Sequence, residues 1–370
     1  MPSRTRKPRP TQKQIAHDLG ISVMTVQRAI HGTGYVSAEL RTQITEYMKR
    51  VDYRPDRAAR SLVKGSHRTV ALFSTDEPRS FWTDVARGID LVAHEIVHFG
   101  FAVDYHRVPH GNTTAYLRVL DRSIRAGLDA AAVVNNSEFD MDRVFRKLDG
   151  SGIPYITLNI DAPETGRLCF VGPDYVREGR IVAHHLRQIM GTRGHVIVVT
   201  GPEQVPRPGL SGAQIEVDRI RGVRDYCAEV RGYSDHELVW TPNSRVDQVA
   251  ERIATAAKAI GRRPVGIYIP HVEPNDADVL FQSLPDVGPV VLSYFSSHTT
   301  RYLDSGRVSA VVYQDPVLQG YLATRVLEHI VESGGPPPSR EYIIQQSLIN
   351  KENAAVVDNL FLVQNLRSRT

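Results

Sequence analysis

Residues 11–37 read TQKQIAHDLGISVMTVQRAIHGTGYVS, and this stretch decides the fold of the first part of the chain. Thr11 and Gln14 have the spacing of a helix capping box, so a short helix is expected to begin here. Gly20 is expected to end that helix, because glycine adopts the left-handed C-terminal turn without strain. The apolar face of this helix consists of Ile15, Ala16 and Leu19.

A second short helix is expected directly after the Gly20 turn, over residues 23–30 and capped by Ser22. Its spacing directs Val26, Ala29 and Ile30 inward. Four side chains near its N-terminal half are left to project outward, namely Val23, Met24, Gln27 and Arg28. Two helices joined by a tight turn, with the second presenting its N-terminal side chains, are the arrangement that places a recognition helix in the DNA major groove.

A third helix is expected from the Ser37 cap, over residues 39–51, to close a small core. Its apolar face consists of Leu40, Ile44, Tyr47 and Met48. A helix pair used only for packing is the alternative, and the charge distribution argues against it. Residues 1–68 hold 14 Lys and Arg against 5 Asp and Glu, a net +9, whereas the remaining 31 against 36 give −5. A basic module ahead of a mildly acidic body indicates a head that binds a polyanion.

The segment after the third helix reads YRPDRAARSL over residues 53–62 and has too few apolar residues to be a stable helix alone. Together, this segment and residues 11–37 resemble the head of the LacI/GalR family of transcription regulators. The resemblance implies that residues 57–62 form a hinge helix whose leucine, here Leu62, enters the minor groove. The DNA contacts that it implies are Thr11, Ser22, Val23, Met24, Thr25, Gln27, Arg28, Ser37, Arg41, Arg57, Arg60 and Leu62.

The head departs from the family pattern at four positions, which are Gln14, Gln27, His31 and Asp56. These departures leave the fold intact but bear on the operator sequence. Val23 and Met24 are apolar where polar residues often stand, so they would contact thymine methyl groups or sense DNA shape.

From residue 69 onward, short apolar segments alternate with amphipathic helical patterns, which predicts parallel sheets with right-handed crossovers. Two such sets in series predict two similar lobes with a ligand between them. The predicted strands are TVALFS, FAVDYH, DAAAVV, IPYITL, HVIVVTG, VGIYIP, PVVLSY and SAVVYQ. The fold class is therefore an all-α helix-turn-helix head followed by a two-lobed α/β body with parallel sheets.

The body is similar to the type I periplasmic-binding-protein-like effector domain of the same family, with REYIIQQSLINKEN as its closing strand. Phe81 and Trp82 match an aromatic pair that stacks on sugars, the alternative being two core aromatics. One aspartate of the usual hydroxyl-binding set is missing near residues 270–276, which points to a ligand that is less polyhydroxylic than a simple hexose or belongs to a different class. The effector contacts that the resemblance implies are Phe81, Trp82, Asn135, Asn159, Arg219, His271, Asp276, Phe295 and Gln314.

Enzyme chemistry is disfavoured by the motifs. His94 and His98 flank Glu95 in a formal HExxH zinc signature, but the helical period places both histidines opposite the apolar face. No P-loop, GxSxG or GxGxxG pattern occurs, and Cys169 and Cys227 lack metal or redox spacing. We therefore expect no catalytic residues, no metal and no cofactor.

The expected organisation is a flexible basic arm (1–10), a helix-turn-helix domain (11–54), a hinge helix and linker (55–68), the effector and dimerisation body (69–350) and a C-terminal tail (351–370). The expected protein is a cytoplasmic homodimeric repressor that binds a near-palindromic DNA operator under allosteric control by a sugar-like molecule. No membrane is involved. A solute-binding protein without gene regulation and a DNA-tethered carbohydrate enzyme are the alternatives. Two questions stay open: whether the ligand releases the DNA or strengthens its binding, and whether the protein is a dimer or a tetramer.

Overall fold

The computed structural model describes residues 12–31, 36–51, 68–200, 212–239, 245–270, 272, 274–293 and 297–354. The chain forms two compact units, Met1–Ser66 and His67–Thr370, which we call the head and the body. None of the helices in these described ranges is long and apolar enough to cross a membrane.

The described part of the head consists of three short helices around a small core. The helices are α1 (Gln12–Asp18), α2 (Val23–His31) and α3 (Ala38–Arg50). Ile15, Ala16 and Val26 are buried together, and Leu19, Ile21, Tyr47 and Met48 pack against them. Helices of 7, 9 and 13 residues are too short to be stable alone in water, so this shared core holds them.

The expected caps and turn of the head are confirmed where the residues are described. The Thr25 N–H donates to Ser22 Oγ at 3.0 Å at the start of α2, and the Leu40 N–H donates to Ser37 Oγ at 3.3 Å at the start of α3. Gly20 has a φ of +63°, which permits the turn between α1 and α2. The proposed Thr11 cap lies outside the described residues.

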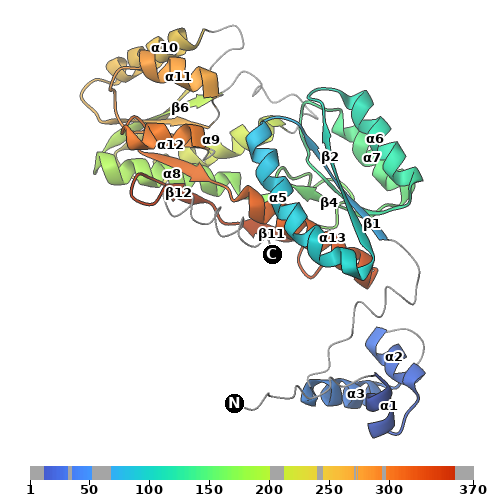
Figure 1. Ribbon diagram of the computed structural model, residues 1–370. Helices are drawn as coiled ribbons and strands as arrows, with labels where there is room; N and C mark the ends of the chain where they lie inside the picture. The colour runs from blue at the N-terminus through green and yellow to red at the C-terminus, as the bar shows by residue number, and fades with distance from the viewer. Residues whose placement is uncertain are drawn as a thin grey trace, which may run out of the picture. The chain divides into compact units, whose positions relative to one another are not determined.

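The body contains two six-stranded sheets, which define an N-terminal and a C-terminal lobe (Figure 1). The strand orders are β11-β5-β4-β3-β1-β2 and β12-β10-β9-β8-β6-β7. The first sheet contains β1 (Arg68–Thr75), β2 (Phe101–Val108), β3 (Leu128–Val133), β4 (Tyr155–Leu158), β5 (Phe170–Pro173) and β11 (Glu341–Ile344). The second contains β6 (Gly194–Thr200), β7 (Tyr233–Val239), β8 (Val265–Ile269), β9 (Val290–Ser293), β10 (Ala310–Tyr313) and β12 (Ser347–Ile349).

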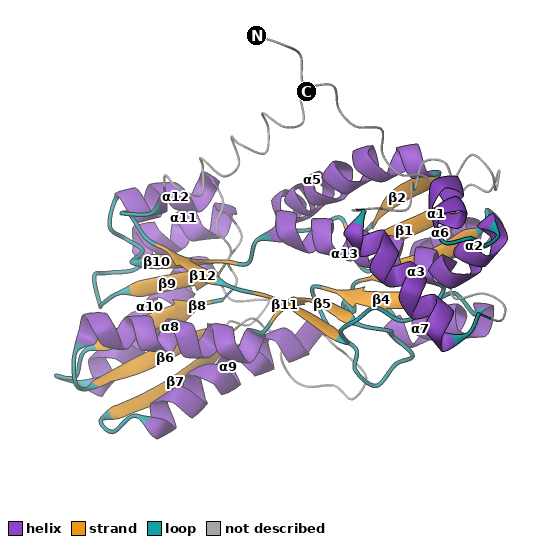
Figure 2. Ribbon diagram, turned by 90° about the horizontal axis from the view of Figure 1, so that it is seen from below, coloured by secondary structure: helices purple, strands orange, loops and turns teal. Residues whose placement is uncertain are grey.

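Helices cover both faces of each sheet, as Figure 2 shows, so each lobe has three layers. The N-terminal lobe carries α5 (Arg79–Ile96), the 3₁₀ turn Val97–Phe99, α6 (Thr113–Arg125), α7 (Met141–Ser151) and α13 (Pro316–Ser333). The C-terminal lobe carries α8 (Tyr175–Met190), α9 (Gly212–Glu229), α10 (Val246–Ile260), α11 (Pro274–Ser283) and α12 (Ser297–Asp304).

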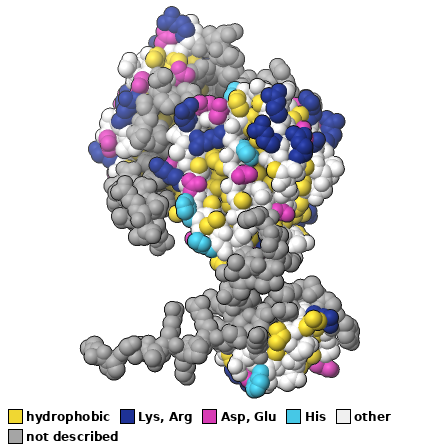
Figure 3. Space-filling view, turned by 45° about the vertical axis from the view of Figure 1, so that its right-hand side comes forward, with side chains coloured by type: hydrophobic (Ala, Val, Ile, Leu, Met, Phe, Trp, Pro, Cys, Tyr) yellow, Lys and Arg dark blue, Asp and Glu magenta, His cyan; other side chains and the backbone are white. Residues whose placement is uncertain are grey.

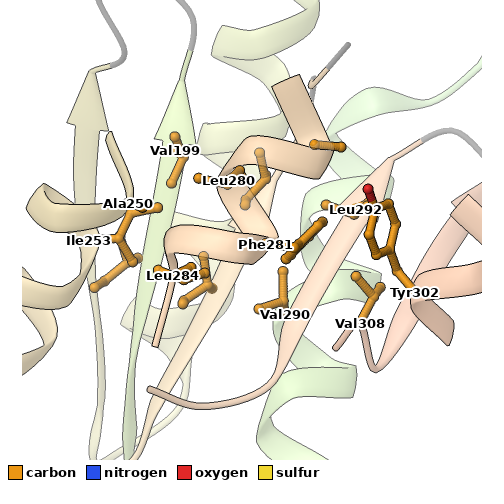
Figure 4. Packing of buried hydrophobic residues seen from close by; sticks show 14 of the residues in the cluster. Val199, Ala250, Ile253, Leu280, Phe281, Leu284, Val290, Leu292, Tyr302 and Val308 are labelled. Carbon is orange, nitrogen blue, oxygen red and sulfur yellow. The ribbon is translucent and has the colours of Figure 1, made fainter. Parts of the chain in front are cut away.

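Alternate residues of the inner strands pack against opposite helix layers. On β6, Val196 and Val198 lie in the core with α8 and α9, whereas Ile197 and Val199 lie in the core with α10 and α11. Figure 4 shows the second of these cores, in which Phe281 of α11 and Leu284, just after that helix, lie near Val290 of β9. A strand buried on both faces has no polar alternation, which explains the continuous apolar runs in the sequence.

All eight predicted body strands are confirmed, but β5 and β7 were missed. The first is only four residues long, and β7, YSDHELV, is an edge strand with several polar side chains. The closing segment is two strands: β11 runs parallel to β5 in one sheet, and β12 runs antiparallel to β10 in the other. The expected parallel sheets are therefore confirmed, with β12 as an antiparallel strand at the edge of the second sheet.

The chain crosses between the lobes three times. It passes from β5 to α8, from β10 to α13, and from β11 to β12, and in each case the element before the link and the one after it belong to different lobes. We call these three links the crossovers. Any change in the angle between the lobes has to be absorbed by them.

A glycine pair lets two helices cross closely in each lobe. A Cβ on Gly88 of α5 would lie 1.9 Å from the Val317 carbonyl oxygen, and one on Gly320 of α13 would lie 2.1 Å from the Val85 carbonyl oxygen. Gly179 of α8 and Gly222 of α9 repeat this arrangement in the other lobe, with carbonyl oxygens at 2.0 Å in both cases. Only glycine permits these crossings, because the clashing atoms belong to the backbone.

We expect Gly320→Ala to lower the free energy of unfolding of the body by about 1–3 kcal/mol, the usual cost of inserting a methyl group into a packed interface. Gly150→Ala is the matched control, since its Cβ would meet nothing within 4 Å on α7, and it should stabilise slightly because alanine favours helix. Urea denaturation of both variants measures the difference. Equal midpoints would contradict the close-crossing argument.

The HExxH pattern is not assembled as a metal site. The His94 Nδ1 atom lies 2.7 Å from the Asp90 carbonyl oxygen, and Glu95 pairs with Arg325 of α13. His98 follows the end of α5, in the 3₁₀ turn. Among the described residues, no group of three or more His, Cys, Asp or Glu could hold a metal ion.

Candidate functional site

The exposed face of α2 is the candidate DNA-reading surface of the head. Met24 is 59% exposed and Arg28 is also exposed. Being four residues apart, they share one face of the helix, while Val26 is buried in the head core. Figure 3 shows hydrophobic side chains at the surface of the described head. An exposed methionine beside an arginine can contact both base methyl groups and phosphates.

The other predicted DNA contacts have varied surroundings. Val23, which was expected to project outward, is partly buried and packs against the head core, because it begins α2 next to the turn. Ser22 and Thr25 are hydrogen-bonded to each other at 2.8 Å, Ser37 caps α3, and Arg41 is exposed. The Gln27 side chain and the residues Thr11, Arg57, Arg60 and Leu62 lie outside what the structure describes.

In the body, a cluster of polar side chains converges on Glu178, in the first turn of α8. The Glu178 carboxylate is fully buried. Its Oε1 atom accepts hydrogen bonds from Arg219 Nε at 2.9 Å, from the Tyr268 hydroxyl at 2.9 Å and from the Ser293 hydroxyl. Its Oε2 atom accepts from Gln314 Nε2 at 3.1 Å and from Gln346 Nε2 at 2.7 Å. We call Glu178 and these five donors the Glu178 cluster.

Arg219 of α9 is the cation of this cluster and is itself only 6% exposed. Its Nη1 atom donates to Glu216 Oε1 at 3.1 Å, and its guanidinium lies over the Tyr175 ring, 4.9 Å from the centroid. Burial alone would lower the pKa of Arg219, but the neighbouring groups, Glu178 first and then Tyr268, Glu216 and Tyr175, together outweigh it and the pKa is raised. The guanidinium is therefore charged and held by two carboxylates.

A chain of hydrogen bonds extends the Glu178 cluster into the N-terminal lobe. Gln319 of α13 donates to the Gln314 carbonyl oxygen at 2.8 Å and accepts from Asn159 Nδ2 at 3.0 Å. Asn159 follows β4 with a φ of +64°, in the left-handed region, which asparagine tolerates better than most residues. Three of the predicted effector residues, Asn159, Arg219 and Gln314, are thus joined in one network.

The Glu178 cluster also touches all three crossovers. Glu178 lies just after the first, Gln314 begins the second directly after β10, and Gln346 lies in the third, between β11 and β12. One buried carboxylate therefore ties the candidate effector arginine to every link between the lobes.

The remaining predicted effector residues are not part of this cluster. Phe81 and Trp82 are 6% and 3% exposed, pack edge to face at 4.9 Å and belong to the core between α5 and its sheet. Their burial matches the alternative of two core aromatics. Asn135 is buried and donates to the Asp161 carbonyl oxygen at 2.6 Å. Asp276 lies partly buried in the first turn of α11, and His271 and Phe295 lie outside the described residues.

Sequence reasoning missed Glu178, Glu216, Gln319 and Gln346. A glutamate in the first turn of a helix is normally a solvated residue that favours the helix dipole, so Glu178 carried no signal of its own. Tyr268 and Ser293 lay within predicted strands and read as ordinary core positions. Two neighbouring buried strands with a polar side chain near their carboxyl ends, Tyr268 on β8 and Ser293 on β9, were the available clue.

Comparison with known proteins identifies both units. The family model for bacterial regulatory proteins of the lacI family matches residues 11–56. The model for the periplasmic binding protein domain matches residues 70–335, which is most of the chain. The first match spans α1 to α3, and the second spans the body from β1 to α13, leaving out only β11 and β12 of the two sheets.

Relatives with known roles match across these units. The HTH-type transcriptional regulator CelR of Thermobifida fusca is 24% identical over 360 residues, covering 95% of this chain and 92% of that protein. A ribose operon repressor of Lactococcus lactis is 30% identical over 196 residues, covering 52% of this chain and 54% of that protein.

Solved structures share the fold of the body. A putative LacI transcriptional regulator from Bacteroides fragilis matches with a TM-score of 0.65 and 16% identity, over 79% of this chain and 99% of that one. A periplasmic ribose ABC transporter from Conexibacter woesei matches with a TM-score of 0.65 and 18% identity, over 79% and 95%. At these identities the similarity concerns the fold.

A helix-turn-helix head and a two-lobed binding-protein body define a ligand-responsive DNA-binding regulator. The chain belongs to the lacI family of bacterial regulatory proteins, with a periplasmic binding protein domain as its body. It is a transcriptional regulator and not an enzyme, because that is the activity of the family. The lacI match also decides against a solute-binding protein without gene regulation.

Proposed function

We propose that the chain acts as a homodimeric repressor on a near-palindromic operator, and that an effector of sugar-like chemistry, bound at the Glu178 cluster between the lobes, controls its DNA affinity. Relatives of the body in solved structures include a protein described as bound to D-arabinose and another bound to myo-inositol, which supports a polyhydroxylated ligand. The homodimer follows the symmetry that helix-turn-helix regulators share with their operators.

The observation that carries this proposal is the connection of Arg219 to all three crossovers through Glu178. A ligand that hydrogen-bonds to Arg219 or Gln314 competes for groups that now hold the crossovers. Ligand binding would therefore change the angle between the lobes, and with that angle the spacing of the two heads in a dimer. A coupling free energy of about 1–3 kcal/mol is enough to change operator affinity roughly 5- to 150-fold.

For the head, we propose that Met24 and Arg28 contact base edges, that Ser22, Thr25, Ser37 and Arg41 contact phosphates, and that the segment with Arg57, Arg60 and Leu62 contacts the minor groove. Lysine and arginine of the head would supply affinity that falls steeply with salt, since binding releases counterions from DNA. The α2 face would supply the specificity.

We expect Arg28→Ala to weaken binding to a selected operator by about 1–3 kcal/mol, roughly 5- to 150-fold, because a bidentate contact to a base is lost. The operator would be isolated by selection from genomic fragments, and affinities measured by gel shift. Arg28→Lys is the control: it keeps the charge, so non-specific binding should persist while discrimination falls. Unchanged discrimination in both variants would remove Arg28 from the reading face.

We expect a thermal-shift screen of sugars, polyols and nucleosides to give at least one compound that raises the melting temperature of the body, as any ligand that binds only the folded state must. The stabilisation should disappear in Arg219→Ala. Asp225→Asn, on the exposed face of α9, is the control and should respond as the parent does. A compound that stabilises Arg219→Ala equally well would place the effector elsewhere.

A further inference from the structure

Two carboxylates hold the only cation of the Glu178 cluster. Arg219 lies between Glu178, at 2.9 Å, and Glu216, at 3.1 Å, and the side chains of the two glutamates are 0% and 12% exposed. Among Glu178, its five donors and Glu216, the formal charges are therefore two negative and one positive. An anion that approached Arg219 would meet an already neutralised guanidinium and a net negative charge, in surroundings that screen charge poorly.

The hydrogen-bonding groups of the Glu178 cluster also disfavour an anionic ligand. Glu178 takes a donor from each of Arg219, Gln314 and Gln346, so these side chains have fewer donors left for a ligand. The acceptors are less fully used. Gln346 is only 4% exposed, yet its Oε1 atom has no hydrogen-bond partner among the described residues. A buried acceptor without a partner is costly, so a donor from a bound molecule would be favourable there.

We propose that Glu178 and Glu216 make the Arg219 site reject anionic ligands, so that its effector is an uncharged compound rich in hydroxyl or amide N–H donors. This inference rests on the proposed effector role of the Glu178 cluster and narrows the ligand class. This ligand class excludes sugar acids and sugar phosphates, although an arginine in a binding site usually suggests such anions. Glu216, which contacts Arg219 but is partly accessible, is the residue that sets this selectivity most directly.

The test uses inorganic phosphate as the probe, titrated into the full chain by calorimetry. Phosphate also binds to the basic head. Only the part of the binding heat that Arg219→Ala abolishes is therefore assigned to the Glu178 cluster. We expect the parent to show no Arg219-dependent binding of phosphate in the concentration range tested. Glu216→Gln should show such binding, with an affinity at least ~10-fold above the limit set by the parent. Asp225→Asn removes the same charge from the exposed part of the same helix and should gain nothing.

Glu178→Gln is the second variant, with its folding checked by thermal melting, and it should gain phosphate binding in the same way. The proposal is overturned if the parent already binds phosphate through Arg219, or if the parent and both glutamine variants bind it equally or not at all. Failure of the neutral-ligand screen would count against the effector role instead. The two results can therefore be separated, since the phosphate test needs no knowledge of the effector.

Discussion

Ile15→Ala is expected to abolish specific DNA binding while the body stays folded. Ile15 is fully buried and, among the described residues of the head, forms a small buried cluster with Ala16 and Val26. Truncating a buried isoleucine costs about 2–5 kcal/mol, and a core this small rarely supplies more than 3–5 kcal/mol. The head should therefore unfold, and operator affinity should fall by at least ~10³-fold, toward the non-specific level.

The measurement pairs gel shift with calorimetric melting of the full chain. Because head and body are separate units, the melting transition of the body should not move. Gln43→Ala, at an exposed position of α3, is the control and should keep both properties. A variant that kept operator affinity within about threefold of the parent would show that the head core is not what orders α2.

Glu178→Ala is expected to lower the free energy of unfolding of the body by about 3–5 kcal/mol, the usual effect of removing one partner of a buried ion pair. The substitution removes the main counter-charge of buried Arg219 and the acceptor of the Tyr268, Ser293, Gln314 and Gln346 donors. Because these donors come from strands and from all three crossovers, the loss affects the whole body.

Urea denaturation gives the free energy directly, and Glu216→Ala is the matched control. Both residues accept a hydrogen bond from Arg219, but Glu216 lies three residues from Arg219 on the same helix, and its side chain is 12% exposed. We expect the control to cost about 1 kcal/mol. Equal losses in the two variants would mean that the contacts to the crossovers contribute nothing.

The head could be predicted almost completely from the sequence, because its information is local. Capping residues, a glycine turn and apolar residues at helical spacing fix three short helices within 40 residues of chain. Val23 is the exception, since its place against the head core depends on how α2 packs with its neighbours. The hinge segment around Leu62 and the tail after Ala354 stay predictions, because they lie outside the described residues.

The body was predictable as alternating strands and helices, but its site was predictable only in part. Arg219, Asn159 and Gln314 were found through motifs and do meet in one network. Phe81 and Trp82, chosen by the same reasoning, are core residues by their burial. A local aromatic pair looks the same in sequence whether it faces a ligand or a sheet.

The sequence by itself determined the two-unit organisation, the helix-turn-helix and the alternation that makes a two-lobed α/β body, since all of these follow from local spacing, caps and charge. The tertiary structure alone decided what surrounds Arg219. Glu178, Gln314 and Gln346 are separated by up to 168 residues, and only the three crossovers bring them to one buried point. Because Glu178 is buried away from water, its carboxylate has to accept hydrogen bonds from protein donors, and Arg219 is the charged one among them.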